Sequence, residues 1–407
     1  MAPASVAPRS RSFYLLLLAL GTSVVCAVCA WFPAVMSRAG ISHGGFWFRD
    51  TFYVLAAIDA KRLGMDPYGP NAMNVHHNYS HWWLWLEHTS LGRRDMAWMG
   101  ALVAGLGLIA GWLSTRPRSA AELAWTWLFF CSPPLLLGLN RANVDWLLFA
   151  LLALLVPAIL ASAPVVRRWG APLLIALATG LKYYPAAGAL LLLAMRPRPD
   201  RRFALWFSGG LIGLVLLNVA PDMARFSSVV EHEGFYVFGA AASFHKAGLP
   251  DGLALGFGIV VLLAAGGWLA SRPMLRTWAV PAELRQEYLY FILGATLLSA
   301  CFLLTANYAY RWMFGLWLLP FLCRLQPVAP GLRRLVAVTR VLLLVQGWGE
   351  VPVIAWLNST PVTKETVEHW EFVTTYLLAI STWMLFACLA GWLLHFLLNE
   401  WRSPESA

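Results

Sequence analysis

Long apolar runs alternate with short polar segments along the whole chain, and this alternation predicts a protein that crosses a membrane many times. The first run extends from Phe13 to about Val35 and follows Arg9 and Arg11. It is long enough to span a bilayer, which takes about 20 apolar residues. It is too long for the hydrophobic region of a cleaved signal peptide. We therefore expect a retained first membrane helix.

Further apolar runs predict the remaining crossings. They comprise residues 96–114, 121–139, 146–163, 171–180, 184–195, 203–220, 252–270, 288–306, 312–323, 335–356 and 372–397. Residues 171–180 and 184–195 are each too short to cross about 30 Å of hydrocarbon at 1.5 Å per residue. They form either a re-entrant hairpin or two tilted helices, and both arrangements hold Lys182 at membrane depth. The pattern predicts an all-α polytopic membrane protein, one integral membrane domain over 1–407, with about twelve transmembrane or half-spanning helices.

Charge is sorted between the two sides of this pattern. The loops expected inside are almost purely basic, whereas carboxylates and histidines gather in the loops expected outside, above all 36–95 and 221–250. Basic loops mark the cytoplasmic side of membrane proteins. The net charge of +10 therefore follows from topology and does not indicate nucleic acid as a partner. We expect a cytoplasmic (inner) membrane protein with both termini inside and its active site facing outside.

Composition and missing motifs narrow the function classes. The chain is 59% hydrophobic, only 12% charged and holds 22 tryptophans, which excludes a soluble globular protein. We find no P-loop, dinucleotide-binding glycine pattern, nucleophile elbow or zinc-protease motif, so we expect no cofactor. The six cysteines lie in or beside apolar runs, which favours buried thiols. The His76, His77, Asn78 and His81 group and the run Glu231-His232-Glu233 could bind a metal, but an aromatic belt and a solvated loop are favoured, and we predict no metal site.

The segment from Phe46 to Pro70 is the first long polar stretch after a predicted span. A short helix-like run begins near Asp50, contains Asp59 and ends at Gly64, before the turn Asp66-Pro67-Tyr68. A carboxylate at a helix start is favoured by the free N–H groups there, so Asp50 could be a plain N-cap. The adjacent aromatic cluster and Arg49 favour the alternative, a catalytic loop at the membrane surface.

Polar residues also stand at the outer ends of several predicted spans. They are Arg141, Asn143, Asp145, Lys182 and Arg311. A charge left at the hydrocarbon centre costs roughly 2.5 to 3.5 kcal/mol. These side chains therefore either extend to the lipid head groups or converge on one outer cavity that faces Asp50. Such a cavity would suit a lipid phosphate.

Ordered motifs resemble a known family at this point. They are Asp50-Thr51-Phe52-Tyr53-Val54-Leu55-Ala56-Ala57, Gly64-Met65-Asp66-Pro67-Tyr68, Asn140-Arg141-Ala142-Asn143-Val144-Asp145, Gly180-Leu181-Lys182-Tyr183-Tyr184-Pro185 and Asn307-Tyr308-Ala309-Tyr310-Arg311. As an ordered set, they resemble the polyprenol-phosphate-dependent glycosyltransferases of family 87, members of the GT-C class that include α-mannosyltransferases. The resemblance implies a GT-C-like bundle whose first loop folds as short interfacial helices.

The resemblance also implies a reaction. It is the inverting transfer of mannose or another hexose from a polyprenyl-phosphate sugar to a lipid, glycan or polymer acceptor on the non-cytoplasmic face of the membrane, with Asp50 as general base. Candidate residues for the donor phosphate or substrate are Arg49, Arg141, Asn143, Asp145, Lys182, His245 and Arg311, and candidates on the acceptor side are Tyr68 and His81. The chain departs from the family after Tyr68, where residues 78–83 replace a Tyr-x-Pro-Pro element, which leaves the acceptor open.

Physical chemistry supports the same reaction, but it leaves alternatives. Sugar transfer needs a carboxylate to take the acceptor proton and cations to hold the departing phosphate, which is already a stable anion and needs no general acid. A transporter or flippase of lipid-linked sugars would share the spans and the intramembrane charges without needing the loop carboxylate. A membrane O-acyltransferase would centre on an intramembrane histidine. His395 is the candidate within a predicted span, but it lies near the expected cytoplasmic end of the last one, away from the outer loops.

Overall fold

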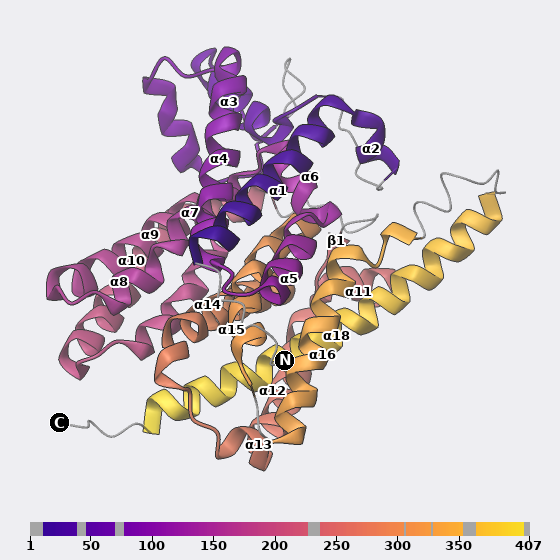
Figure 1. Cartoon of the computed structure of the whole chain (residues 1–407). Helices are drawn as coiled ribbons and strands as arrows, with labels where there is room; N and C mark the ends of the chain where they lie inside the picture. Colours follow the sequence, from indigo (N-terminus) through magenta and orange to yellow (C-terminus); the bar gives the residue numbers. More distant parts are fainter. Residues whose placement is uncertain are drawn as a thin grey trace.

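The computed structural model describes residues 11–38, 46–69, 77–226, 237–304, 307–326, 329–352 and 364–402. These residues form an all-α membrane protein with one short pair of strands (Figure 1). Six helices are long and apolar enough to cross a membrane, and one bent pair raises the number to seven. The multi-pass helical fold is therefore confirmed. The number of about twelve crossings stays a prediction.

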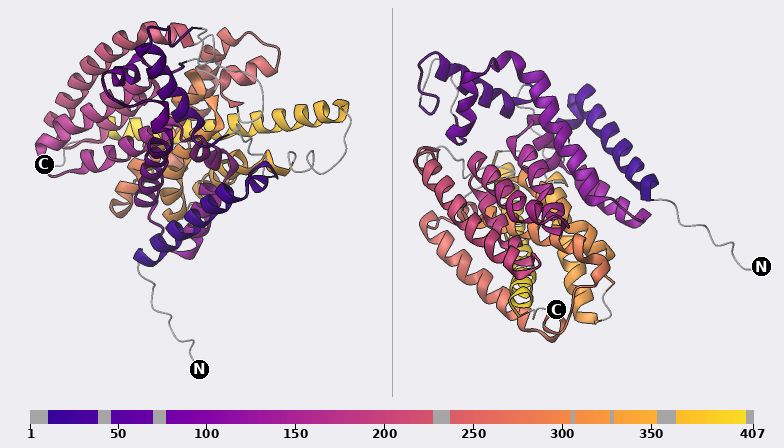
Figure 2. Two further views of the ribbon diagram at one scale, coloured as in Figure 1. Left: turned by 90° about the horizontal axis from the view of Figure 1, so that it is seen from above. Right: turned by 90° about the vertical axis from the view of Figure 1, so that its left-hand side faces the viewer.

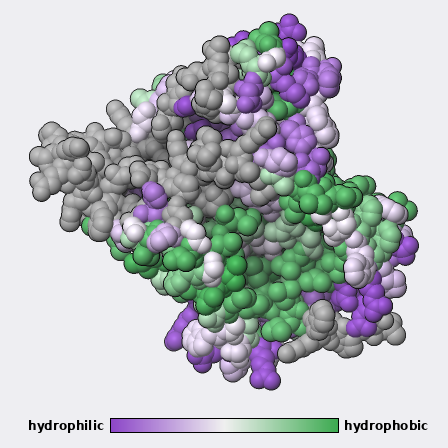
Figure 3. Space-filling model, turned by 180° about the vertical axis from the view of Figure 1, so that it is seen from behind, coloured by the Kyte–Doolittle hydropathy of each residue, from purple (hydrophilic) through white to green (hydrophobic). Residues whose placement is uncertain are grey.

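The long helices form the frame of the bundle. They are α1 (Arg11–Trp31), α4 (Met96–Thr115), α10 (Arg198–Phe226), α12 (Asp251–Ser271), α14 (Arg285–Leu304) and α18 (Lys364–Arg402). In the apolar part of α14, 78% of the residues are buried, against 17–44% in the other candidate spans, so α14 is the central helix. Seen from behind, apolar residues form a broad band between hydrophilic margins, as a lipid-facing surface does (Figure 3).

Several apolar runs that we expected to be single helices are broken. Residues 121–139 form α5 (Ala120–Phe130) and α6 (Pro133–Arg141), which meet at 58°. Pro133 and Pro134 explain the break, because a proline has no N–H to continue the helix and disfavours helical backbone before it. Residues 146–163 likewise divide into α7 (Val144–Ala153) and α8 (Leu155–Leu160).

The two half-length pieces remain separate. They are the α-helix α9 (Ala171–Leu181) and the 3₁₀-helix η4 (Tyr184–Ala194), and they meet at Lys182. The predicted span 312–323 begins as a second 3₁₀-helix, η7 (Ala309–Trp317), and continues as α15 (Leu318–Arg324). Each such junction leaves backbone groups without helical partners, so these breaks need donors and acceptors from elsewhere in the protein.

Two strands that the sequence did not predict lie near these breaks. Strand β1 (Val237–Phe238) pairs antiparallel with β2 (Asn307–Tyr308), with Val237 opposite Tyr308. The pair ties the start of α11 (Ala240–Lys246) to the entrance of η7. The helix α10 continues to Phe226, past the expected start of the second loop at 221, and residues 227–236, including Glu231-His232-Glu233, lie outside the described residues.

The first loop, residues 36–95, contains short helices, as expected. They are the end of α2 (Pro33–Arg38), then α3 (Arg49–Arg62), η1 (His81–His88) and η2 (Arg93–Asp95). They gather at one end of the bundle, where α3 contacts α4 and α6 (Figures 1 and 2). His76 lies outside the described residues. The remaining elements are η3 (Val166–Gly170), α13 (Pro273–Arg276), η6 (Ala282–Leu284) and α16 (Pro330–Trp348).

Candidate functional site

The start of α3 is docked on the turn between α6 and α7. The Phe48 N–H donates to the Asn140 carbonyl at 2.8 Å, and the Thr51 hydroxyl donates to the Ala142 carbonyl at 2.8 Å. Phe48 and Ala142 both have left-handed backbone conformations, with φ of 63° and 44°. Such conformations in residues other than glycine cost of order 1–3 kcal/mol each and cluster at functional sites. The two hydrogen bonds therefore hold the beginning of α3 in place and offset part of this cost.

Asp50 is the second residue of α3, and its side chain is almost fully buried. Its Oδ1 atom accepts from Arg141, with Nε at 2.8 Å and Nη2 at 2.7 Å, and its Oδ2 accepts from Asn143 Nδ2 at 2.5 Å. The N-cap of α3 is Phe48, which makes no side-chain capping bond. The N-cap alternative for Asp50 is therefore wrong, because the carboxylate binds two side chains from the α6–α7 turn and not the end of its own helix.

Asn143 connects Asp50 to a second carboxylate. Its side-chain oxygen accepts from the Asp145 N–H at 2.9 Å, so Asn143 is the N-cap of α7. This bond fixes which end of the Asn143 amide faces α7. The NH₂ group consequently faces Asp50 and also lies 3.4 Å from the Tyr79 hydroxyl.

Asp145 is fully buried and collects two of the expected phosphate-binding cations. Lys182 Nζ lies 2.7 Å from Oδ1 and Arg311 Nε lies 3.1 Å from Oδ2. The Tyr184 hydroxyl also donates to Oδ1, at 3.0 Å. Both cations are thus paired with a carboxylate of the protein, and their role as ligands of a phosphate stays a prediction. Charges removed from water need opposite charges, and Asp145 supplies one for both.

Six residues thus form one continuous group, which we call the buried charge cluster: Asp50, Arg141, Asn143, Asp145, Lys182 and Arg311. It contains three cations and two carboxylates. The structure brings together predicted residues from α3, the α6–α7 turn, the α9–η4 break and η7. The ion pair between Asp145 and Arg311 alone joins positions 166 residues apart.

Tyrosines surround the buried charge cluster, and sequence reasoning did not select them. The Lys182 ammonium lies 5.3 Å from the ring centre of Tyr79, the Arg311 guanidinium 5.2 Å from that of Tyr184, and the Arg141 guanidinium 5.7 Å from that of Tyr308. Aromatic faces attract cations at such distances. The sequence carried a sign of this arrangement, because the motifs that contain Lys182 and Arg311 also contain tyrosines. The motif of Arg141 contains none, and its ring comes from β2.

The loop helix η1 closes over the α9–η4 break. The Ser80 hydroxyl donates to the Gly180 carbonyl at 2.5 Å, and Trp83 Nε1 donates to the Leu181 carbonyl at 3.2 Å. These bonds satisfy carbonyls that the end of α9 leaves without helical partners. A Cβ at position 180 would lie 2.0 Å from the Trp82 ring, so only glycine fits this contact.

The two acceptor-side candidates lie on this loop. His81 binds Asp222 at the end of α10, with both its N–H (2.8 Å) and its Nδ1 (2.7 Å) on Asp222 Oδ2. Tyr68 packs its ring 5.2 Å from that of His77, which in turn lies 5.7 Å from the Tyr79 ring. The Tyr68 hydroxyl also donates to the Tyr79 carbonyl at 3.5 Å, so Tyr68 lies beside a tyrosine that contacts the buried charge cluster. His81 anchors the loop to α10.

Burial controls protonation in this ring stack. Loss of water lowers the pKa of His77 to about 4, although the Ser80 carbonyl and Asp222 act in the opposite direction. The imidazole is neutral at pH 7, and no described residue binds its Nδ1. Burial, reinforced by the charge of Asp50, raises the pKa of Tyr79 well above its usual range. The Tyr79 hydroxyl beside Asn143 consequently keeps its proton.

Two predicted residues take other places. Arg49 donates from Nε to the Tyr53 hydroxyl at 2.9 Å and lies against that ring, one turn further along α3. His245 is exposed on α11. The described contacts of the buried charge cluster include neither residue. Both were selected because they are polar residues in the two long loops, a pattern that does not encode direction.

The structure contains an apolar cavity of about 410 Å³ whose lining includes residues close in sequence to Asp50 and Arg141. It is lined by Cys26, Ala27, Cys29, Ala30, Trp47, Phe48, Ala104, Leu108, Leu136, Leu139 and Asn140. Most of this lining comes from α1, α4 and α6, and it includes Phe48 and Asn140, whose backbones are hydrogen-bonded to each other. Cys26 and Cys29 are free thiols that form part of this wall.

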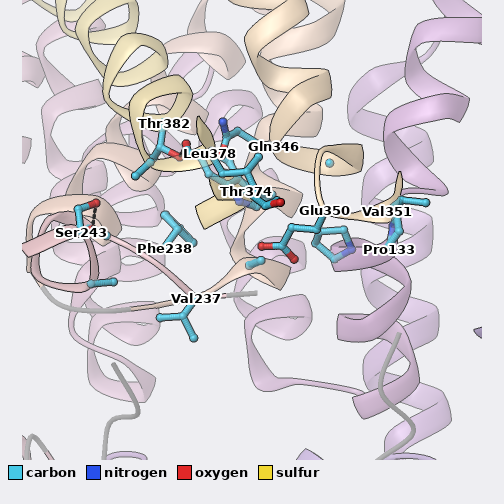
Figure 4. Close-up of a pocket in the computed structure, with 17 residues that line it drawn as sticks. Pro133, Val237, Phe238, Ser243, Gln346, Glu350, Val351, Thr374, Leu378 and Thr382 are labelled. Carbon is cyan, nitrogen blue, oxygen red and sulfur yellow. Dashed lines mark hydrogen bonds between the residues drawn. The ribbon is translucent and has the colours of Figure 1, made fainter. Parts of the chain in front are cut away.

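A second, much smaller cavity lies between β1, η7, α16 and α18 (Figure 4). Its volume of about 50 Å³ suits a few waters at most, and none of the predicted site residues lines it. The Glu350 carboxylate and Gln346 face it from the α16 side, and Thr382 from α18. The helix η7, which carries Arg311, also lines this cavity, but the described polar side chains that face it carry carboxylate, amide and hydroxyl groups and not cations.

Within the described ranges, no three His, Cys, Asp or Glu side chains group as metal ligands; His77 and His81 turn to different partners. The comparisons with known proteins add no assignment to this geometry. No protein-family model and no curated protein matches the sequence.

Proposed function

We propose that this protein is an inverting glycosyltransferase that moves a sugar from a polyprenyl-phosphate donor to a lipid or glycan acceptor, with Asp50 as the general base. The observation that carries the proposal is the buried charge cluster. In it, a loop carboxylate is fixed beside a second carboxylate and three cations, next to an apolar cavity. The sugar is a hexose such as mannose, and the reaction takes place on the non-cytoplasmic face of the cytoplasmic membrane.

Asp50 keeps room for a proton. A carboxylate has about four lone-pair positions, two on each oxygen. Arg141 occupies both on Oδ1 and Asn143 one on Oδ2, so one position on Oδ2 remains for an acceptor hydroxyl. Arg141 and Asn143 also fix the direction of this position, and positioned bases contribute typically 10²- to 10⁴-fold in rate.

The cations stabilise the negative charge that develops on the departing phosphate. As the acceptor oxygen bonds to C1 of the sugar, the bond from C1 to the phosphate oxygen breaks and its electron pair stays on the phosphate. The acceptor proton passes to Asp50. The buried charge cluster has one more cation than carboxylates, so an arriving phosphate neutralises it. Cations held in a water-poor site stabilise such charge more than cations in water do.

The apolar cavity supports a lipid-linked donor. Phe48 and Asn140 line it, and Asp50 and Arg141, which follow them closely in the sequence, belong to the buried charge cluster. A polyprenyl chain in this cavity would bring its phosphate to the edge of the buried charge cluster. A water-soluble nucleotide sugar would gain nothing from an apolar wall built by α1, α4 and α6.

Incubation of the purified protein with a panel of polyprenyl-phosphate sugars and glycan acceptors tests the proposal. Loss of one donor together with formation of free polyprenyl phosphate and a glycosylated acceptor is the expected result. The alternative, a flippase of lipid-linked sugars, predicts intact donor that changes leaflet in vesicles. Transport without donor consumption across the panel would replace the proposed function by that alternative.

A further inference from the structure

A second group of arginines lies at the opposite end of the bundle from Asp50. Helix α4 connects the two ends: Gly100 faces Phe48 beside the first site, and Thr115 ends the helix beside the arginines. At 1.5 Å per residue these positions are about 22 Å apart, which is most of the hydrocarbon thickness. The arginine group is therefore a separate feature at the other membrane surface.

A cavity of about 230 Å³ opens among these arginines. Its charged lining consists of Arg11, Arg116, Arg118, Arg324 and Glu287, contributed by the starts of α1 and α14, the α4–α5 connection and the end of α15. The volume is several times the ~30 Å³ that one water occupies in the liquid. It falls below the roughly 300–1,000 Å³ of a drug-sized ligand pocket. A small charged group fits this space.

Part of the positive charge is neutralised within the protein. Arg118 and Arg324 both bind Oε1 of Glu287, and Arg324 Nε also binds Glu122 at 3.1 Å. Arg11 and Arg116 have no carboxylate partner among the described residues. The cavity therefore holds two cations whose charge is not compensated, which favours an anion.

The cavity is also built in advance. Arg324 donates from Nη2 to the Arg116 carbonyl at 2.7 Å and to the Thr115 carbonyl at 3.3 Å, which fixes the turn that carries Arg116. The side chain of Arg324 is 7% exposed, so these bonds are shielded from water. Glu287 Oε2 is buried and has no hydrogen-bond partner among the described residues. An occupant with a hydroxyl or ammonium group would supply the missing donor.

The surroundings match the membrane interface. Leu15 and Leu113 complete the lining, and along α1 the side chains of Leu16 and Leu20 are exposed. Basic pockets between membrane helices bind the head groups of anionic lipids. We propose that this cavity binds the phosphate of an anionic phospholipid head group. The acyl chains then lie along α1, and a head-group hydroxyl, as in phosphatidylglycerol, donates to Glu287.

Lipid binding to matched variants tests this proposal without any activity assay. The purified full-length protein in detergent is titrated with phosphatidylglycerol, with phosphatidylcholine and with inorganic phosphate. Retained lipid is counted by native mass spectrometry, and the melting temperature is recorded. The test variant is Arg11→Gln with Arg116→Gln. The control is Arg333→Gln with Arg334→Gln, which removes the same charge from exposed positions at the start of α16.

The wild type and the control are expected to retain phosphatidylglycerol in preference to phosphatidylcholine. The test variant should bind it about 10- to 100-fold more weakly, since each basic residue near a membrane surface is worth about 1 kcal/mol. If the double variant does not fold, Arg116→Gln alone is used, with a smaller loss expected. Equal binding by test and control, or equal retention of both lipids, would overturn the proposal. Stabilisation by inorganic phosphate as large as that by lipid would identify a free anion as the ligand.

Discussion

Arg141 binds Asp50 through two of its guanidinium nitrogens, at 2.8 and 2.7 Å from one carboxylate oxygen, although the residues are 91 positions apart. The contact joins the first loop to the α6–α7 turn. It leaves the other carboxylate oxygen to Asn143 and, in the proposed reaction, to the acceptor hydroxyl. Guanidinium geometry matters here, because a lysine ammonium cannot present two parallel N–H groups.

Arg141→Lys is therefore expected to lower kcat by about 10- to 100-fold while charge is conserved, because the direction of Asp50 is no longer fixed. Steady-state kinetics with the authentic donor measure this effect. Arg94 forms an exposed ion pair in the same loop, so Arg94→Lys is the control and should leave kcat unchanged. Equal kcat for wild type and Arg141→Lys would show that charge alone is needed.

Asp145 is predicted to be a stability residue. Asp145→Ala leaves Lys182 and Arg311 buried without a counter-charge, which should lower the free energy of unfolding by about 3–5 kcal/mol. Adding Lys182→Met removes one of the stranded charges and should restore part of that loss. Thermal unfolding of the three proteins in one detergent provides the comparison. A double variant less stable than Asp145→Ala would contradict the pairing.

The apolar cavity predicts a dependence on lipid length. Ala104→Trp places a large ring in its wall, so KM should rise about tenfold for a long polyprenyl-phosphate sugar and much less for a short-chain analogue. Ala101→Trp, on the exposed side of the same helix, is the control. If Ala104→Trp affected both donors equally, the chain would bind elsewhere.

His77 predicts how stability changes with pH. Its pKa is lowered to about 4 in the folded protein, against about 6.5 when unfolded, so the unfolded chain binds a proton first as the pH falls. Stability from the neutral ring is complete above pH 6.5 and is lost between pH 6.5 and 4, by roughly 3 kcal/mol in total.

The variant His77→Gln cannot take up this proton. Its melting temperature should therefore fall less than that of the wild type between pH 7 and pH 5. The contributions of all other titrating groups are the same in both proteins and drop out of the difference between their melting temperatures. Parallel pH curves for the two proteins would show that the ring is not buried in its neutral form.

Sequence patterns predicted the parts of this molecule that depend on local chemistry. Apolar run lengths indicate membrane helices because the bilayer has a fixed thickness, and the break at Lys182 was visible as two short pieces. Motifs at helix ends also contained the members of the buried charge cluster, because charged residues at membrane depth are stable only when they pair with other polar groups.

What could not be predicted depends on contacts between distant segments. The sequence left open whether Lys182 and Arg311 extend to the head groups or converge on a cavity facing Asp50, and it did not specify that both bind Asp145. The bend at Pro133 and the β1–β2 pair also depend on how the helices pack. Arg49 shows the same limit, because its direction is set by Tyr53 on its own helix.

The substitution Asp50→Asn addresses the catalytic base. Asparagine can still accept from Arg141, but its NH₂ group would face the NH₂ group of Asn143, whose amide is fixed by α7. Some stability is therefore lost whatever the role of Asp50. The control must also remove a carboxylate of the first loop that pairs with arginine. Asp59→Asn does so, because Asp59 binds Arg62 and Arg93 on the same loop, outside the buried charge cluster.

Turnover per folded molecule, measured with the authentic donor for Asp50→Asn and Asp59→Asn, tests the central claim most directly. A general base at Asp50 predicts a fall of about 10²- to 10⁴-fold for Asp50→Asn, with donor still bound, and little change for Asp59→Asn. Near-wild-type turnover of folded Asp50→Asn would remove this carboxylate from the mechanism and contradict the glycosyltransferase proposal.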